Sequence, residues 1–319
     1  MPITCEFEYH RPKTLPQALD LLSRHGKRAS VLAGGTDLLV WLKEGLHSPA
    51  AVVDVKSIRE LHRLEQKAGA LLVGACVTFS ELLESTIVRE KLPLLWECSR
   101  TVASVGVRNR ATLVGNICSA APSLDGAPAL LAYEATVLVA GCKGRREIPI
   151  AEWFVGPKKT ALRNGELAVG VKIPLPKRKN GACYVKLGRY RGEDLAQVGV
   201  GILALAGEEY RVSFCAVGPV PTRAGKIERC LNGKKLTDEL IREALDLVPK
   251  EIRPITDVRA GKEYRMHMAK VMLERGLRAA MARMNGNRAA TGVRCGGREG
   301  AVPPGKRAVA VPAYGESVI

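Results

Sequence analysis

The chain has 319 residues, of which 46% are hydrophobic and 25% are charged, as in ordinary globular proteins, and it is long enough for two domains with separate cores. It contains no window of eighteen uninterrupted apolar residues, and its start, "MPITCEFEYHRPKTL", has no apolar segment, so we expect neither a transmembrane helix nor a secretory signal. The formal net charge of +17 is unusual, but the basic residues are dispersed and only 4% of residues are aromatic, which argues against nucleic-acid binding and favours a solvated surface or an acidic protein partner.

The cysteine and histidine patterns indicate neither a disulfide framework nor a metal centre. The nine cysteines are scattered singly, with no Cys-x-x-Cys pair, so we expect reduced thiols in a cytoplasmic protein. The histidines are isolated in the sequence and lack the spacing of metal ligands. We expect each to be a surface or helix residue: His10, His25, His47, His62 and His267.

Helix and strand patterns alternate along the first part of the chain. "TLPQALDLLSRHG" predicts a helix with Thr14 as N-cap, Pro16 in its first turn and Gly26 at its end. "ASVLAGG" then predicts a buried strand, and "TDLLVWLKEG" predicts a helix capped by Thr36 or Asp37. "AVVDV" predicts another strand, and "ALLVGACVTFSELL" a passage from strand to helix. This interleaving indicates an α+β or α/β fold.

The rest of the chain shows a second apolar block followed by strands and helices. Residues 105–140 end in a helix predicted from Pro128 onward, because proline is favoured at the first helical positions. Prolines and charges then cluster, and we expect a domain boundary near residue 176. Strands are predicted at "ACYVKLGRY", "AQVGVGILALAG" and "YRVSFCAVG", and helices at "TDELIREALDLV" and "YRMHMAKVMLERGLRAAMARM". No Rossmann or Walker phosphate-binding motif occurs in the chain.

The stretch "AGGTD", residues 33–37, places two glycines between a predicted strand and a predicted helix. Glycine permits positive φ and close approach of a ligand to the backbone, and unpaired N–H groups at a helix start favour anions. The hydroxyl of Thr36 would add a donor suited to a diphosphate. A glycine pair before a helix is also found in simple tight turns, so at this point both interpretations stand.

A second stretch, "ATLVGNICSAAPSLDG", residues 111–126, is unusually rich in small and hydrogen-bonding side chains. A core strand seldom carries so many, because polar groups that are buried without partners destabilise the fold. The residues concerned are Thr112, Gly115, Asn116, Ser119, Ser123 and Asp125. They could bind a ligand that has phosphates and hydroxyls, or they could make local turn hydrogen bonds.

Together these two stretches resemble a known family. "AGGTDLL" followed by "RNRATLVGNICSAAPSLDGAPALLA" resembles the FAD-binding domain of the molybdenum hydroxylases, which include xanthine dehydrogenase, carbon monoxide dehydrogenase and 4-hydroxybenzoyl-CoA reductase. "KLGRYRGEDLAQVGVG", "AVGPVPTRA" and "DVRAGKEYRMHMAKVMLERGL" resemble the carboxy-terminal domain of the same family. In many members the flavin is carried on a separate medium subunit of similar length.

The resemblance implies an α+β fold with two domains and a tail. A two-part FAD-binding domain of the PCMH type is expected over residues 1–176, divided near residue 57. A smaller α+β carboxy-terminal domain is expected over residues 177–286. The Gly-, Arg- and Pro-rich residues 287–319 are expected to form a flexible tail.

The resemblance also implies which residues hold the flavin. A first loop would bind the diphosphate through Leu32, Ala33, Gly34, Gly35, Thr36 and Asp37. A second would bind diphosphate, ribityl chain and adenosine ribose through Thr112, Gly115, Asn116, Cys118, Ser119 and Asp125. Beside the flavin ring the resemblance implies Val102, Ala103, Lys186 and Leu195, the last on a face that an electron acceptor could approach.

The chain departs from the family pattern in the second loop. That pattern is Thr-x-Gly-Gly-Asn, and Val114 stands at its first glycine. If the position requires positive φ, we expect strain at Val114 or a shifted loop. The cysteine-bearing insertion of the benzoyl-CoA reductase type is missing, so we expect no iron–sulfur cluster in this chain, and we interpret Cys118 as a small buried thiol.

The function implied by the resemblance is electron transfer through non-covalently bound FAD. A large molybdopterin subunit would hydroxylate the substrate, a small subunit with [2Fe-2S] clusters would relay the electrons, and this chain would deliver them to NAD+, a quinone or oxygen. The form "AGGTD" favours the xanthine dehydrogenase type. The alternatives are the carbon monoxide dehydrogenase type and a stand-alone flavin oxidase.

Overall fold

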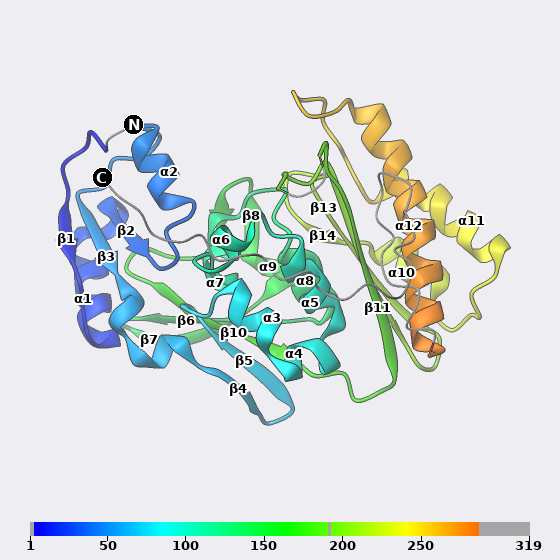
Figure 1. Cartoon of the computed structure of the whole chain (residues 1–319), viewed down its shortest axis with the longest axis horizontal. Coiled ribbons are helices and arrows are strands. Elements are labelled where there is room, and N and C mark those ends of the chain that lie inside the picture. Colours follow the sequence, from blue (N-terminus) through cyan, green and yellow to red (C-terminus); the bar gives the residue numbers. More distant parts are fainter. Residues whose placement is uncertain (1–2, 191–192, 287–319) are drawn as a thin grey trace, which may run out of the picture.

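The computed structural model describes residues 3–190 and 193–286, in which three larger sheets follow one another along the chain (Figure 1). A three-stranded sheet lies at one end, a five-stranded sheet with many short helices lies in the middle, and a four-stranded sheet with three helices lies at the other end. The arrangement confirms the expected α+β architecture. The expected tail, residues 287–319, lies outside the described residues.

The first sheet is parallel, with strand order β1-β3-β2. Its strands are β1 (Glu8–His10), β2 (Ala29–Leu32) and β3 (Ala51–Asp54), and its helices are α1 (Leu15–His25) and α2 (Leu38–Lys43). As predicted, Thr14 caps α1 and Gly26 follows its end at a φ of 55°. The prediction that the second strand is buried is wrong in part: Ser30 is buried but Val31 is 36% exposed, because this edge of the sheet borders a cavity.

The second sheet is antiparallel, with strand order β4-β5-β10-β6-β7, and forms the largest core. Its strands are β4 (Leu64–Lys67), β5 (Ala70–Gly74), β6 (Thr136–Gly141), β7 (Gly144–Pro149) and β10 (Leu167–Pro174). Its helices are α3 (Phe79–Glu84), α4 (Thr86–Lys91), α5 (Pro93–Arg100), α6 (Val105–Arg108), α7 (Leu113–Ser119), α8 (Ala127–Ala132) and α9 (Ile150–Trp153), and a small hairpin joins β8 (Phe154–Gly156) to β9 (Lys159–Thr160). Pro128 lies in the first turn of α8, as predicted. The buried indole of Trp153 donates to the carbonyl of Ile117 at 2.9 Å, which ties α9 to α7.

The third sheet, with order β11-β12-β13-β14, contains the three strands predicted beyond residue 176. Its strands are β11 (Asn180–Leu187), β12 (Val198–Leu205), β13 (Glu209–Cys215) and β14 (Thr222–Arg223), and its helices are α10 (Gly225–Leu231), α11 (Asp238–Leu247) and α12 (Lys262–Met284). Helix α12 packs tightly on this sheet: a Cβ at Gly276 would stand 2.1 Å from Cδ1 of Ile202. Short 3-10 turns occur at Gly26–Arg28, Val55–Ser57, Arg59–His62 and Val248–Lys250.

The second and third sheets are joined by helices and by polar contacts. Helices α5 and α8 of the middle region pack against β11, β12 and β13. Glu97 on α5 forms an ion pair with Arg283 on α12 at 2.7 Å and accepts a hydrogen bond from the backbone N–H of Tyr184 at 2.8 Å. Among the described residues, no helix has both the length and the apolar character needed to cross a membrane.

Candidate cofactor-binding site

A cavity of about 760 Å³ lies between the first sheet and the helices of the middle region, within the usual 300–1,000 Å³ range of small-molecule sites. Four chain segments, drawn from residues 30–55, 102–125, 158–168 and 189–195, line it together with Ala75. Of the residues that the resemblance assigned to a flavin, the following line this one cavity: Ala33, Gly34, Gly35, Thr36, Asp37, Val102, Ala103, Thr112, Gly115, Asn116, Cys118, Ser119, Asp125 and Leu195. Leu32 and Lys186 do not line it.

The two glycines of the first loop have separate structural reasons. Gly35 has a φ of +79°, a conformation that favours glycine. Gly34 lies against the backbone of the second stretch, because a Cβ there would stand 2.1 Å from the carbonyl oxygen of Arg110. The glycine pair therefore lets the two stretches contact each other. It also leaves the backbone of the first loop uncovered on the side of the cavity.

The first loop leaves several backbone donors free. Within residues 3–190 and 193–286, the N–H groups of Gly34, Gly35 and Thr36 have no hydrogen-bond acceptor. The predicted side-chain cap on the next helix is wrong: Asp37 occupies the N-cap position of α2 but makes no capping hydrogen bond. Free N–H groups beside a cavity are suited to bind an anion such as a diphosphate.

In the second stretch, the expected turn hydrogen bonds form, and the side chains that make them also line the cavity. Thr112 caps α7 by accepting from the N–H of Gly115 at 2.9 Å, and Ser119 donates to the carbonyl of Asn116 at 2.9 Å. The side-chain oxygen of Asn116 accepts from the N–H of Gly126 at 3.3 Å, while its amide nitrogen has no acceptor among the described residues. These local bonds fix the same side chains that line the cavity.

The strain considered for Val114 does not arise. Val114 is the second residue of α7, is buried, and is not one of the described residues with positive φ. The left-handed residue of this stretch is Ala120, which follows the last residue of α7 and has a φ of 46°. A valine is tolerated at this position because a helical backbone makes no demand for glycine.

Asp125 lines the cavity and belongs to a buried polar network. Its carboxylate oxygens accept hydrogen bonds from the hydroxyl of Tyr184 and from Nζ of Lys186, both at 2.7 Å. Nζ of Lys186 also donates to the carbonyl of Thr101 at 2.8 Å. Burial raises the pKa of Asp125, while the Lys186 ammonium opposes that rise. Lys186 thus lies behind Asp125 and holds it in place.

The wall formed by Val102 and Ala103 is apolar but has an unusual backbone. Ala103 has a φ of 36°, and one guanidinium nitrogen of Arg108 donates to the carbonyls of both Val102 and Ala103 at 2.7 Å. Cys118 lies across the same cavity, and burial raises the pKa of its thiol to about 12. Cys118 is therefore a neutral thiol in the wall, and it is partly buried where a buried thiol was expected.

Leu195 stands at the opening of the cavity. It is 60% exposed, and its backbone N–H donates to the carboxylate of Asp194 at 2.8 Å. Against the effect of burial, this bond and one from the N–H of Arg189 hold the pKa of Asp194 below its usual value. Leu32 lies on the other side of the first loop, packed against the cluster of Leu38 and Leu42.

Several lining residues were not predicted. His47 was expected on the surface, but it lines the cavity and its ring lies 2.7 Å from the hydroxyl of Ser30. Lys158 approaches the ring of Trp41, with 5.9 Å between its ammonium and the ring centroid. Nothing in their local sequence marks these residues, because the segments around residues 30–55 and 158–168 meet only in the folded chain.

Free backbone donors of the first loop and the apolar wall of Val102 and Ala103 line the same cavity. A diphosphate joined to a flat ring requires both features, so the fold and the cavity define a nucleotide-cofactor protein. The residues present therefore fit FAD. The model of the FAD binding domain in molybdopterin dehydrogenase matches residues 5–176, and that of the CO dehydrogenase flavoprotein C-terminal domain matches residues 182–280. The chain belongs to this family: it is an FAD subunit of the molybdenum hydroxylase class and part of an oxidoreductase.

Individual relatives cover nearly the whole described chain. The carbon monoxide dehydrogenase medium chain of Hydrogenophaga pseudoflava is 33% identical over 281 residues, which are 87% of this chain and 98% of the relative. The xanthine dehydrogenase FAD-binding subunit of Escherichia coli O157:H7 is 30% identical over 284 residues, 87% of this chain and 97% of the relative. A solved carbon monoxide dehydrogenase from Hydrogenophaga pseudoflava matches with a TM-score of 0.85 at 33% identity, over 89% of this chain and 99% of that one.

Proposed function

We propose that this chain carries electrons through a non-covalently bound FAD, from the [2Fe-2S] clusters of a small partner subunit to a terminal acceptor. In this proposal a large partner subunit holds the molybdopterin and performs the hydroxylation. The observation that carries the proposal is the single cavity lined by both predicted loops, with free N–H groups on Gly34, Gly35 and Thr36. The names of the relatives, "medium chain" and "FAD-binding subunit", support a multi-subunit assembly.

The residues of this chain would bind and orient the cofactor. The free amides of the first loop would hold the diphosphate, Asn116 would donate its amide to the same group, and Asp125 would accept from a ribose hydroxyl. Val102 and Ala103 would pack against the ring. When bound, FAD supplies the redox chemistry, accepting and releasing electrons while the protein sets its position and surroundings. The exposed Leu195 would border the route of the terminal acceptor.

The hydroxylase type belongs to the proposal as well. The sequence "AGGTD" favours the xanthine dehydrogenase type, while the first relative given above is of the carbon monoxide type, and identities of 30% and 33% do not separate the two. The proposal includes NAD+, a quinone and oxygen as candidate terminal electron acceptors. We further propose assembly in the cytoplasm, supported by free thiols at the eight described cysteines, and docking of the basic chain, with net charge +17, on acidic partner surfaces.

The test begins with the visible spectrum of the chain purified with its partner subunits. A flavin spectrum with an iron–sulfur shoulder, whose flavin is released as FAD by acid, is the expected result. Anaerobic addition of xanthine or of carbon monoxide then identifies the type by which one bleaches the flavin, and NAD+, a quinone and oxygen are compared for reoxidation. A chain that stays colourless after added FAD would overturn the proposal. Substrate turnover by the chain alone would favour the stand-alone oxidase instead.

A further inference from the structure

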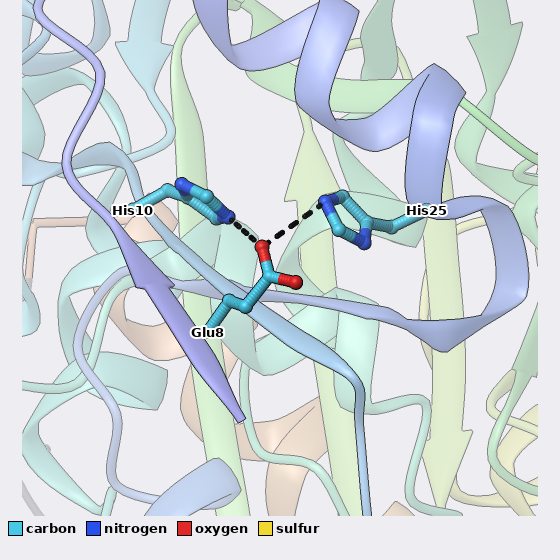
Figure 2. A group of neighbouring side chains, drawn as sticks. All are labelled: Glu8, His10 and His25. Atoms are coloured by element: carbon cyan, nitrogen blue, oxygen red, sulfur yellow. Dashed lines mark hydrogen bonds and ion pairs between the residues drawn. The ribbon is translucent and has the colours of Figure 1, made fainter. Parts of the chain in front are cut away.

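Two histidines that are fifteen residues apart in the sequence meet beside a glutamate on the first sheet (Figure 2). The Nε2 of His10 lies 3.0 Å from Oε2 of Glu8, and the Nε2 of His25 lies 3.9 Å from the same oxygen. All three atoms lie within 4.8 Å of one another. These histidines are isolated in the sequence, as expected, but they are neighbours in the folded chain.

The fold explains the convergence. Glu8 and His10 are alternate residues of β1, so their side chains leave the same face of the strand, while Tyr9 points to the other face and donates to Asp54. His25 is the last residue of α1, which packs on the sheet. The two imidazole rings are 5.6 Å apart at their centroids and inclined by 42°, so both can turn a nitrogen toward the carboxylate.

We propose that Glu8, His10 and His25 form a binding site for a divalent transition-metal ion, with Zn²⁺ the best match. Two imidazole nitrogens and one carboxylate oxygen are ligands that zinc takes readily, with a fourth position left for water. Zinc bonds of 2.0–2.1 Å in a tetrahedral arrangement require neighbouring ligand atoms about 3.3 Å apart. The observed separations of 3.0 and 3.9 Å bracket that value, so small side-chain rotations would complete the site.

The local charges favour a cation at this position. The carboxylate of Glu8 supplies a negative charge, and the carboxyl end of the eleven-residue helix α1 adds the negative end of the helix dipole. The nearest basic neighbour on the helix, Arg24, is engaged by Asp20, and Arg11 donates to the hydroxyl of Ser57 at 2.7 Å. The side chains of Glu8, His10 and His25 are 65%, 30% and 19% exposed, so an ion can reach them from solvent.

The effect of such an ion would be structural. It would tie β1, a three-residue strand at the edge of the sheet, to the end of α1. The chain runs from His25 through Gly26 into β2, and β2 leads directly to the loop at residues 33–37 that lines the cavity. The site would therefore strengthen the frame of the first loop without touching the cofactor, and it does not depend on which acceptor or substrate the complex uses.

The test is calorimetric titration of Zn²⁺ into the full chain after treatment with a chelator and removal of that chelator. We expect one Zn²⁺ per chain, and we expect Glu8→Gln, His10→Gln and His25→Gln each to weaken binding by at least about 10-fold, the scale seen when even an outer-shell partner of a metal site is lost. His267→Gln, on the exposed side of α12, is the matched control and should bind as the unchanged chain does.

Thermal unfolding gives an independent readout, since an ion that binds only the folded state raises the unfolding midpoint. Added Zn²⁺ should raise the midpoint of the unchanged chain and of His267→Gln equally, and should raise that of Glu8→Gln less at the same Zn²⁺ concentration. Glu8 is exposed, so this variant should fold normally. The absence of saturable Zn²⁺ binding would overturn the proposal. Binding of equal strength in the three cluster variants would also overturn it, by assigning the zinc to other groups such as the cysteines.

Discussion

The two walls of the cavity are built in opposite ways. In the first loop, residues 33–37, three consecutive N–H groups have no acceptor within the described chain, and the side chains of Thr36 and Asp37 make no capping bond. In the second stretch, residues 112–125, Thr112 caps a helix and Asp125 is bonded by two side chains from β11. The first wall has backbone N–H donors without acceptors, whereas the second wall is held in place by hydrogen bonds within the chain.

This difference predicts which residues act in binding FAD and which act in stabilising the fold. Changes in the second stretch should lower the stability of the chain even without cofactor, because they break bonds that the fold itself makes. Changes in the first loop that remove a donor without a steric clash should lower the affinity for FAD while the free energy of unfolding stays nearly constant; Gly34, where the two walls touch, is the exception. Each of the following variants tests one side of this contrast.

The largest loss of stability is expected for Asp125→Ala. The side chains of Lys186 and Asp125 are only 11% and 9% exposed, so removing the carboxylate leaves a buried ammonium with the Thr101 carbonyl as its remaining partner. Breaking a buried ion pair from one side costs about 3–5 kcal/mol, and we expect a loss near the lower end. Urea unfolding of the flavin-free chain measures it. Adding Lys186→Met should recover part of the loss, and a loss below about 1 kcal/mol would show that Asp125 does not hold this wall.

Gly34→Ala comes next, because its Cβ would stand 2.1 Å from a backbone oxygen that cannot rotate away. Overpacking of this kind costs about 1–3 kcal/mol, and the displaced loop should also lose FAD. The control is Gly106→Ala in α6, where the nearest atom would be 4.0 Å away. Unfolding free energy and retained FAD are measured for both variants, and equal behaviour of the two would contradict the close approach at Gly34.

Thr112→Ala should have a smaller effect. It removes the hydroxyl that accepts from the N–H of Gly115, and loss of such a cap costs about 1 kcal/mol. Thr112→Ser keeps the hydroxyl and should stay within about 0.5 kcal/mol of the unchanged chain in urea unfolding. If the serine variant loses as much as the alanine variant, packing of the methyl group and not the cap is what matters.

Thr36→Val should have the smallest effect on stability. The hydroxyl of Thr36 makes no hydrogen bond within the described residues, so the free energy of unfolding of the flavin-free chain should change by less than about 0.5 kcal/mol. If the hydroxyl binds the diphosphate, its loss should weaken FAD binding by about 1 kcal/mol, roughly 5-fold. Flavin fluorescence titration measures this, with Thr36→Ser as control. Unchanged FAD affinity would remove Thr36 from the proposed diphosphate site.

Local patterns made much of the fold predictable. The helix from Thr14 to Gly26 carries its own start and stop signals, and the strands after residue 176 are closed by turn residues, so both follow from neighbours in the chain. The domain limits at residues 57 and 176 stay predictions. For the site, the family resemblance pointed to two loops that do line one cavity, but the role of each residue in binding FAD stays a prediction until it is measured.

Other features could not be predicted from local patterns. Lys158 reaches the cavity from a segment more than a hundred residues beyond Trp41 and His47, and no spacing marks any of the three. The sequence also could not show why position 34 requires glycine. The carbonyl of Arg110, which leaves no room for a side chain there, is seventy-six positions further along the chain.

The sequence alone indicated the family, the small polar character of the two loops, and part of the secondary structure, because these depend on contacts between near neighbours or on motifs kept in order. The elements it indicated are α1, α2, α3, α8, α11 and α12 and strands β2, β3, β5, β11, β12 and β13, whereas the short helices α4 to α7 were not predicted. Only the tertiary structure decided that Lys186 supports Asp125 from behind, that Val114 is relaxed within a helix, and that the side chains of Glu8, His10 and His25 lie together. The physical reason is common to all three. Hydrogen bonds and ion pairs act over about 3–4 Å and metal bonds over about 2 Å, and the fold sets which side chains come that close.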